Sequence, residues 1–319
     1  MDNAWYDDFL DILNEKYPKK GQLTQELMDL LSIEREAVYR RLRKEVLFPI
    51  NEVVKIASKL GLSLDEITGL NSDKVSFLMQ PINYLKPTNE DTSYMKRMIK
   101  LINNFRNSPN SEYMEICNKL PRSLTSGFQQ LRKFSIFKWN YQYGEEKINL
   151  PYSKINITKP MQQTMLDFYL AMKNISQVSY IFDNMLFDYL VGDIRYFHAI
   201  QMITDEDKEL LKEEISNLID YLYLVTNIGA FPETRNTVNF YISQINIDTN
   251  YSYLYTDNYK VFRIHVFNKY ETKNYDPETV SKFRTWMQLK KRSTIQISAV
   301  DEKSRIEYFD RQRILIESL

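Results

Sequence analysis

The sequence predicts a multidomain chain that is all-α in its N-terminal part and α+β in its C-terminal part. Its 319 residues exceed one small domain and suffice for two or three, each able to bury a core. Apolar residues have helical spacing over much of residues 1–229 and alternate beyond Pro232, as they do in strands. We therefore expect a five-helix bundle over residues 1–70, a linker over residues 71–89, and over residues 90–319 a helical connector followed by an α+β regulatory or dimerisation domain with a small antiparallel sheet.

The N-terminal bundle is expected to contain five short helices. Thr24 is the expected N-cap of the second helix, and residues 32–34 form a short turn before the third. Gly61 suits the left-handed position that ends a helix, and the residues after it have capping-box spacing. These signals predict helices at residues 5–17, 24–31, 35–44, 51–60 and 63–66.

Helices also dominate the middle of the expected fold. Turn-forming residues are concentrated between Gly69 and Asn89 and predict the linker. Helical spacing resumes beyond Glu90 and predicts further helices near residues 95–102, 112–120 and 124–137. Residues 158–191 are expected to form a long helical stretch, either continuous or broken near residues 174–176. We expect this stretch to pair with an amphipathic helix over residues 204–229 as an antiparallel hairpin.

Strand patterns follow the hairpin. Residues 238–245, 251–256 and 259–267 alternate, and the Asp257–Asn258 pair suits a two-residue turn, so we expect a three-stranded meander. A helix capped by Asp276 and, after it, a strand at 294–298 and a helix at 302–318 complete the chain. Helices flanking a small antiparallel sheet make this part α+β.

Composition excludes several classes of protein. Lys+Arg and Asp+Glu both total 42, so any attraction to nucleic acid must come from a local patch. The single Cys117 cannot form an internal disulfide, and two histidines are too few for the usual zinc sites. Acidic residues interrupt the most apolar stretch, residues 178–191, and the N-terminal residues do not resemble a secretory signal. We expect a cytoplasmic protein that has no cofactor, no metal and no membrane segment.

Two segments carry a family resemblance. Residues 22–44 read QLTQELMDLLSIEREAVYRRLRK and residues 56–67 read IASKLGLSLDEI, and together they resemble the lambda-repressor/Cro-like (XRE) helix-turn-helix family. The run at residues 39–43 also resembles the recognition helix of a group of Bacteroidetes transcription regulators. Ser32 stands where that family usually has a turn glycine. The resemblance implies a DNA-binding domain over residues 1–70, in which one helix packs behind a recognition helix.

The third helix supports the same assignment by its own pattern. Val38 and Leu42 are four residues apart and face the core, which leaves several basic residues and Tyr39 on the opposite side. Arginine can bind guanine edges or phosphates, and tyrosine can donate to a phosphate or touch a thymine methyl. Gln25, at the start of the second helix, is expected near the DNA backbone. The candidate DNA-binding residues are Gln25, Arg35, Tyr39, Arg40, Arg43 and Lys44.

A simpler interpretation of these charges stays open. The five basic residues within 35–44 would then only form the water-facing side of an amphipathic helix. Residues 1–70 carry 10 Lys+Arg against 13 Asp+Glu, which is unusual for a DNA-binding module.

The sequence offers little catalytic chemistry elsewhere. His198 and His265 have no metal-ligand partner at a suitable spacing, and Cys117 is expected to be a buried thiol. Glycine-rich phosphate loops, nucleophile elbows and zincin motifs are absent from the sequence, so we do not expect an enzyme. Aromatic residues are expected to pack the core, or else to line an apolar ligand pocket or a dimer interface: Tyr251, Tyr253, Tyr255, Phe182, Phe187 and Tyr189.

The resulting hypothesis is a transcription regulator that binds double-stranded DNA. Its C-terminal part would form a homodimer, sense a small-molecule effector, or both, because one helix-turn-helix module makes a small interface that two-fold symmetry doubles. A rival hypothesis is an interaction protein that uses the helix-turn-helix fold for docking. An enzyme in the C-terminal domain is the third.

Overall fold

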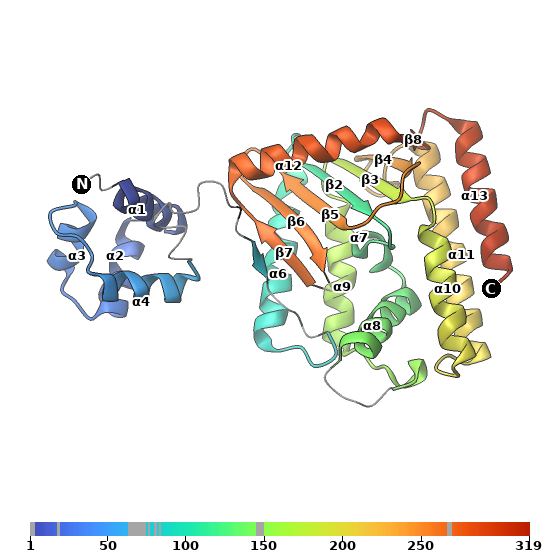
Figure 1. Ribbon diagram of the computed structural model, residues 1–319, viewed down its shortest axis with the longest axis horizontal. Helices are drawn as coiled ribbons and strands as arrows, with labels where there is room; N and C mark the ends of the chain where they lie inside the picture. Colours follow the sequence, from blue (N-terminus) through green and yellow to red (C-terminus); the bar gives the residue numbers. More distant parts are fainter. Residues whose placement is uncertain are drawn as a thin grey trace. The chain divides into compact units, whose positions relative to one another are not determined.

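The chain folds into two compact units, Met1–Ser76 and Phe77–Leu319. The computed structural model describes residues 4–17, 20–62, 75, 77–79, 82, 84–144, 150–266 and 270–319, and Figure 1 traces them. The division falls inside the predicted linker of residues 71–89. Part of that linker belongs to the second unit, where Ile82 and Tyr84 are buried in the core.

The first unit is a bundle of helices around one small core. The core is formed by residues such as Phe9, Leu27 and Ile56, because each helix turns its apolar stripe inward. The described helices are α1 (Ala4–Lys16), α2 (Lys20–Leu31), α3 (Arg35–Leu42) and α4 (Ile50–Leu60). The predicted fifth helix, at residues 63–66, lies outside the described residues.

Two predicted helix boundaries in this unit are wrong. Helix α2 begins at Lys20, so Thr24 is a buried residue of its second turn and not its cap. Helix α3 ends at Leu42 because Lys44, with a φ of +66°, has a left-handed backbone that a right-handed helix cannot contain. Gly61 has a φ of +64° at the end of α4, as predicted.

The second unit is built on one mixed sheet, whose strand order among the described residues is β1-β7-β6-β5-β2-β3-β4-β8. Strands β2, β3 and β4 are parallel to one another, and all other neighbours are antiparallel. The strands are β1 (Leu78–Met79), β2 (Glu112–Cys117), β3 (Gln177–Asp183), β4 (Thr237–Ser243), β5 (Asn250–Tyr255), β6 (Lys260–Val266), β7 (Tyr270–Asn274) and β8 (Thr294–Gln296).

This sheet overturns the prediction of a small antiparallel one. Residues 112–120, predicted as a helix, begin with strand β2, and the predicted long helix over residues 158–191 is divided by strand β3. Both strands are buried in the middle of the sheet. A buried parallel strand is apolar on both faces and has no alternation, so its sequence resembles that of a buried helix. Only part of the predicted helical hairpin over residues 158–229 is present. Helix α10 (Leu186–Ala199) contacts α11 (Asp205–Ile228), whereas strand β3 separates α9 (Lys159–Met172) from this pair along the chain.

The predicted meander has one incorrect member. Strand β4 lies between β3 and β8, and the antiparallel run is β5, β6 and β7. The turn at Asp257 and Asn258 does join β5 to β6, with Tyr255 opposite Lys260. Neighbouring strands along the chain need not be neighbours in a sheet when the connection between them is long enough to cross other strands.

Helices cover both faces of the sheet (Figure 1). Helix α12 (Pro277–Leu289) packs on one face, where Tyr253 and Phe262 are buried against it. The other face carries the main core and a group of helices: α6 (Asn89–Asn104), α7 (Arg122–Thr125), α8 (Gln129–Tyr143), α9 (Lys159–Met172), α10 (Leu186–Ala199), α11 (Asp205–Ile228) and α13 (Glu302–Glu317). Short 3-10 turns are η1 (Phe105–Asn107), η2 (Tyr152–Lys154) and η3 (Lys290–Ser293).

Aromatic residues lie mainly in these two cores. Tyr253 is fully buried on the α12 face, and the rings of Phe262 and Phe283 stack there at 4.1 Å between centroids. Phe182 was predicted to lie on a helix, but it lies on strand β3. It is buried in the main core with Phe187.

Candidate functional sites

Helices α2 and α3 are joined by a tight turn in the first unit. Residues 32–34 separate Leu31, at the end of α2, from Arg35, at the start of α3. Ser32 has a φ of +55°, a left-handed conformation that favours glycine. This conformation explains why the family that the sequence resembles uses glycine at this position.

The inner face of α3 holds the bundle together. Val38 is fully buried, and Leu42 packs against the same core. The guanidinium of Arg41 makes a two-pronged ion pair with Glu52 of α4, in which Nε donates to Oε2 at 2.7 Å and Nη2 donates to Oε1 at 2.9 Å. Arg41 is therefore a structural residue that fixes α3 on α4.

The outer face of α3 carries four of the six candidate DNA-binding residues. Arg35 donates from Nε to the hydroxyl of Tyr39 at 3.3 Å. Arg43 lies between Glu36 and Glu45, with N–O distances of 2.8 Å to each carboxylate. The Nε of Arg40 is 3.4 Å from the same Glu45. The side chains of both Arg40 and Arg43 are 54% exposed, so these ion pairs are formed in water.

The other two candidates lie elsewhere. Gln25 is exposed in the second turn of α2, where its amide donates to Asp29 at 3.0 Å, and the prediction that it lies at the start of that helix is wrong. Lys44 follows the end of α3 and pairs with Asp7 of α1. The structure thus brings Arg35, Tyr39 and Arg40 together on α3, with Arg43 beside them as its C-cap, and leaves Gln25 and Lys44 off that helix.

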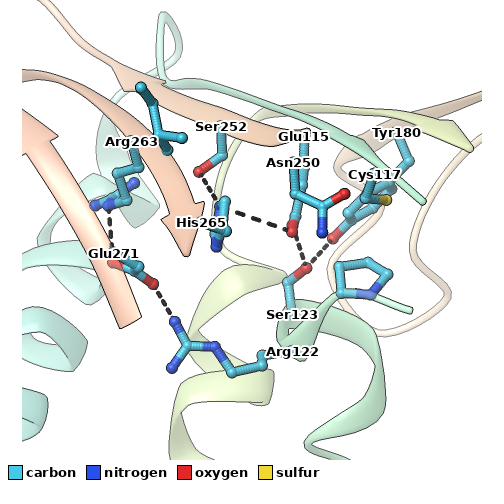
Figure 2. Close-up of polar contacts among 12 residues, drawn as sticks. Glu115, Cys117, Arg122, Ser123, Tyr180, Asn250, Ser252, Arg263, His265 and Glu271 are labelled. Carbon is cyan, nitrogen blue, oxygen red and sulfur yellow. Dashed lines mark hydrogen bonds and ion pairs between the residues drawn. The ribbon is translucent and has the colours of Figure 1, made fainter. Parts of the chain in front are cut away.

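A second candidate site lies in the second unit, on the face of strands β6 and β7 that is opposite to α12. Figure 2 shows its polar contacts. Glu271 receives an ion pair from Arg122 of α7, and its Oε2 is 3.5 Å from both Arg263 Nε and Lys273 Nζ. Arg263 and Lys273 have side chains only 7% and 6% exposed. Two buried cations and the partly exposed Arg122 therefore converge on one carboxylate.

Burial and these neighbours shift the acid–base behaviour of the cluster. Burial alone would raise the pKa of Glu271, but the charges of Arg122 and Arg263 hold that pKa below its usual value. Burial lowers the pKa of Lys273 to about 8. At neutral pH Glu271 is ionised and Lys273 is mostly protonated.

Glu115 on β2 forms a neighbouring network (Figure 2). Its carboxylate accepts hydrogen bonds from Tyr113 OH at 2.6 Å and from Ser123 Oγ at 3.1 Å. Tyr180 OH donates in turn to Ser123 Oγ at 3.0 Å. Burial raises the pKa of Glu115 to about 7, although both hydrogen bonds act to lower it. Glu115 therefore titrates near neutral pH.

His265 completes the network without forming a catalytic triad. Its Nε2 is 3.0 Å from Ser252 Oγ and 4.0 Å from Glu115. A nucleophilic serine and an orienting acid must use the two different ring nitrogens, and here both contacts are at Nε2. Burial lowers the pKa of His265 to about 4, so the ring is neutral at pH 7.

The remaining candidate groups have ordinary surroundings. His198 lies 2.9 Å from Asp205 at the surface, and Cys117 is a free thiol buried in the core, as predicted. Among the described residues, no group of three or more His, Cys, Asp and Glu side chains could hold a metal ion. The helices of the described ranges include none that is both long and apolar enough to cross a membrane.

Two adjoining hollows open onto the polar cluster. The first has a volume of about 70 Å³ and the second about 90 Å³. Both are lined by Tyr113, Arg122, Phe168, His265 and Glu271, so the Arg122–Glu271 ion pair lies at their common border.

Sequence reasoning missed this site because its residues come from distant parts of the chain. One signal was present: Arg263 and His265 alternate on one strand, and Glu271 and Lys273 alternate on the next. Charged residues at alternate positions usually face water. Here these residues lie on the face of the sheet that packs against α6 and α9.

Comparisons with protein-family models, with curated proteins and with solved structures give no match to this chain. The helix-turn-helix resemblance of residues 22–44 and 56–67 therefore stays an expectation from the sequence.

Proposed function

We propose that this protein is a transcription regulator that binds double-stranded DNA in a sequence-specific manner through α3. The observation that carries the proposal is the outer face of this helix, where Arg35, Tyr39, Arg40 and Arg43 gather opposite the buried Val38. The tight turn with left-handed Ser32 supports it, because it sets α3 at an angle to α2. An α-helix with its side chains is about 10–12 Å across, which matches the roughly 12 Å width of the major groove.

The energetics favour an exchange of partners at this face. Exposed ion pairs such as Arg43 with Glu36 contribute little to stability, because water screens both charges. A good two-pronged contact from arginine to guanine is worth about 1–3 kcal/mol of discrimination. Arg40 and Arg43 therefore lose little when they leave Glu45 for a base or a phosphate. The acidic partners would hold the arginines in extended positions until DNA replaces them.

The first unit as a whole does not attract DNA over long distances. Acidic residues outnumber basic ones over residues 1–70. We infer that non-specific binding is weak and that base contacts dominate recognition. Two copies of the chain, joined through the second unit, would double the interface on a palindromic site. Such a regulator acts in the cytoplasm.

A second candidate function is protein docking by the first unit. Exposed aliphatic residues on and before α4 favour it: Leu47 is 39%, Ile50 is 73% and Val54 is 43% exposed. An apolar patch of this kind can bind a partner protein.

Selection of genomic fragments by the purified full-length chain separates the two functions. We expect a recurring sequence to be enriched, and we expect Arg40→Ala combined with Arg43→Ala to abolish the enrichment. A folded wild-type chain that enriches no sequence would contradict the proposal and favour docking.

A further inference from the structure

The first hollow of the second unit has an excess of positive charge. Among the described residues that line it, Arg122, Arg263 and Lys273 are cationic at neutral pH, and Glu271 is the anion. His265 also lines the hollow and contributes no charge, because its ring is neutral. Two positive charges thus remain without a matching carboxylate at the wall.

Such an excess is costly in a folded protein. A buried positive charge without a counter-charge is strongly destabilising, so such a group normally has a shifted pKa or binds an anion. Burial lowers the pKa of Lys273, but the two arginines keep their protons and their charges. An anion in the hollow would relieve the cost.

The hydrogen-bond donors of this cluster can form further hydrogen bonds. The contacts from Arg263 and Lys273 to Glu271 are both 3.5 Å, at the long limit of a hydrogen bond. An arginine carries five donor hydrogens and a lysine three, so both can donate to a second acceptor. The hydroxyl of Tyr94 lies at the same hollow and is buried without a hydrogen-bond partner among the described residues. The Lys273 Nζ is 4.3 Å from the Tyr94 ring centroid.

The other walls are apolar. Met95 and Met98 of α6, Met165 and Met172 of α9, Phe168 and Leu254 line the hollow. Methionine is flexible and polarisable, so it adapts to ligands of varied shape. A hollow with one cationic end and apolar walls matches a molecule with one acidic end and an apolar body.

We propose that the hollow between α6, α9 and strands β5–β7 binds a small monocarboxylate with an apolar body. Arg263, Lys273 and Tyr94 receive the carboxylate, and the methionines and Phe168 surround the body. At roughly 10–15 Å³ for each water-sized unit, the 70 Å³ hollow holds about five to seven such units. This space holds a carboxylate about as large as butyrate or pentanoate, and hexanoate or benzoate would extend into the adjoining hollow.

This site is formed by residues of the second unit and α3 belongs to the first, so the inference does not depend on DNA binding. The test uses the full-length chain, with isothermal calorimetry and thermal unfolding as readouts. The probes are hexanoate, benzoate and phenylacetate, each compared with its neutral amide, and phenyl phosphate is a further arm. We expect at least one carboxylate to bind, with a Kd at least tenfold lower than that of its amide, and to raise Tm.

Two variants locate the site. Lys273→Met keeps the length of the side chain and removes its charge, so carboxylate binding should weaken at least tenfold while amide binding stays the same. Lys282→Met, on the exposed side of α12, is the matched control and should change neither. Met98→Trp, at a half-exposed position, should fill the hollow and weaken carboxylates and amides alike, which keeps the test valid if Lys273→Met fails to fold.

Three outcomes would overturn the proposal. The first is that no carboxylate binds the folded wild-type chain at millimolar concentration. The second is that amides bind as tightly as carboxylates, because the site would then be merely apolar. The third is that phenyl phosphate binds more tightly than every carboxylate, because the anion class would then be wrong.

Discussion

The arginines of α3 and the cations of strands β6 and β7 are both paired with glutamates, but they differ in exposure. Arg40 and Arg43 are 54% exposed beside Glu45, whereas Arg263 and Lys273 are 7% and 6% exposed beside Glu271. In water an ion pair forms and breaks at little cost, so exposed arginines can change partners. In the protein interior the same pairing is needed to offset desolvation, and losing one partner leaves an uncompensated charge. The comparison shows that the same residue types can form ion pairs that change partners easily in one unit and ion pairs that are needed for stability in the other.

Removal of the buried carboxylate is expected to have the largest effect. Glu271→Gln leaves Arg122, Arg263 and Lys273 without their anion and should lower the free energy of unfolding by about 3–5 kcal/mol. Glu45→Gln is the matched control, because Glu45 also pairs with two arginines, and it should change stability by less than about 0.5 kcal/mol. Chemical denaturation measures both. Equal losses of unfolding free energy in the two variants would contradict the difference that we infer between buried and exposed ion pairs.

Glu115 should make stability depend on pH. Burial raises its pKa from the usual 4.5 to about 7 in the folded chain, so the folded state holds its proton over a range in which the unfolded state has lost it. Its contribution is complete below pH 4.5 and is lost as the pH rises to about 7, by at most about 1.4 kcal/mol per pH unit. Glu115→Gln should lack this term. We therefore expect the stability of the variant relative to wild type to increase between pH 5 and 7, and a pH-independent difference would refute the assignment.

Arg41 and Arg40 provide a test within one helix. Arg41→Ala leaves Glu52 half-buried and unpaired, and it should cost about 1–3 kcal/mol of stability. Arg40→Ala removes an exposed side chain and should change stability by less than about 0.5 kcal/mol. Denaturant midpoints of the two variants decide the matter. If Arg40→Ala proves the more destabilising, our distinction between the inner and outer faces of α3 fails.

The smallest expected effect is at the turn between α2 and α3. Ser32 has a left-handed backbone, so Ser32→Gly should stabilise the first unit by about 0.5–1 kcal/mol. Ser58→Gly in the interior of α4 should instead destabilise it, by about 0.5–1 kcal/mol. Opposite signs in thermal unfolding would support the turn geometry, and a destabilising Ser32→Gly would contradict it.

The sequence predicted best those elements whose signals are local. Amphipathic spacing located α1, α4 and α11. In the structure α11 begins after a capping box at Thr204 and ends at the left-handed Gly229. Strands β2 and β3 were missed because both of their faces are buried and their sequences do not alternate. The pairing of β4 with β3 and β8 depends on long connections that leave no local mark.

The two candidate sites differ in the same way. The outer face of α3 could be predicted because its four residues lie within the short segment 35–43, which is α3 and its C-cap. The cluster around Glu271 could not, since Arg122 and Glu115 reach it from α7 and β2. No spacing rule links residues that meet only when a sheet and its covering helices have formed.

The central claim, DNA recognition by α3, is tested most directly by the affinity and salt dependence of DNA binding in a folded Arg40→Ala/Arg43→Ala variant. A matched control, Lys290→Ala/Lys303→Ala, makes the same change of charge in the second unit. Each arginine that contacts a base should account for about 1–3 kcal/mol of affinity, and each that contacts phosphate should reduce the salt slope by about one. We predict such a loss in the α3 variant and none in the control. Unchanged affinity and salt dependence in the α3 variant would contradict the claim and remove this helix from the DNA interface.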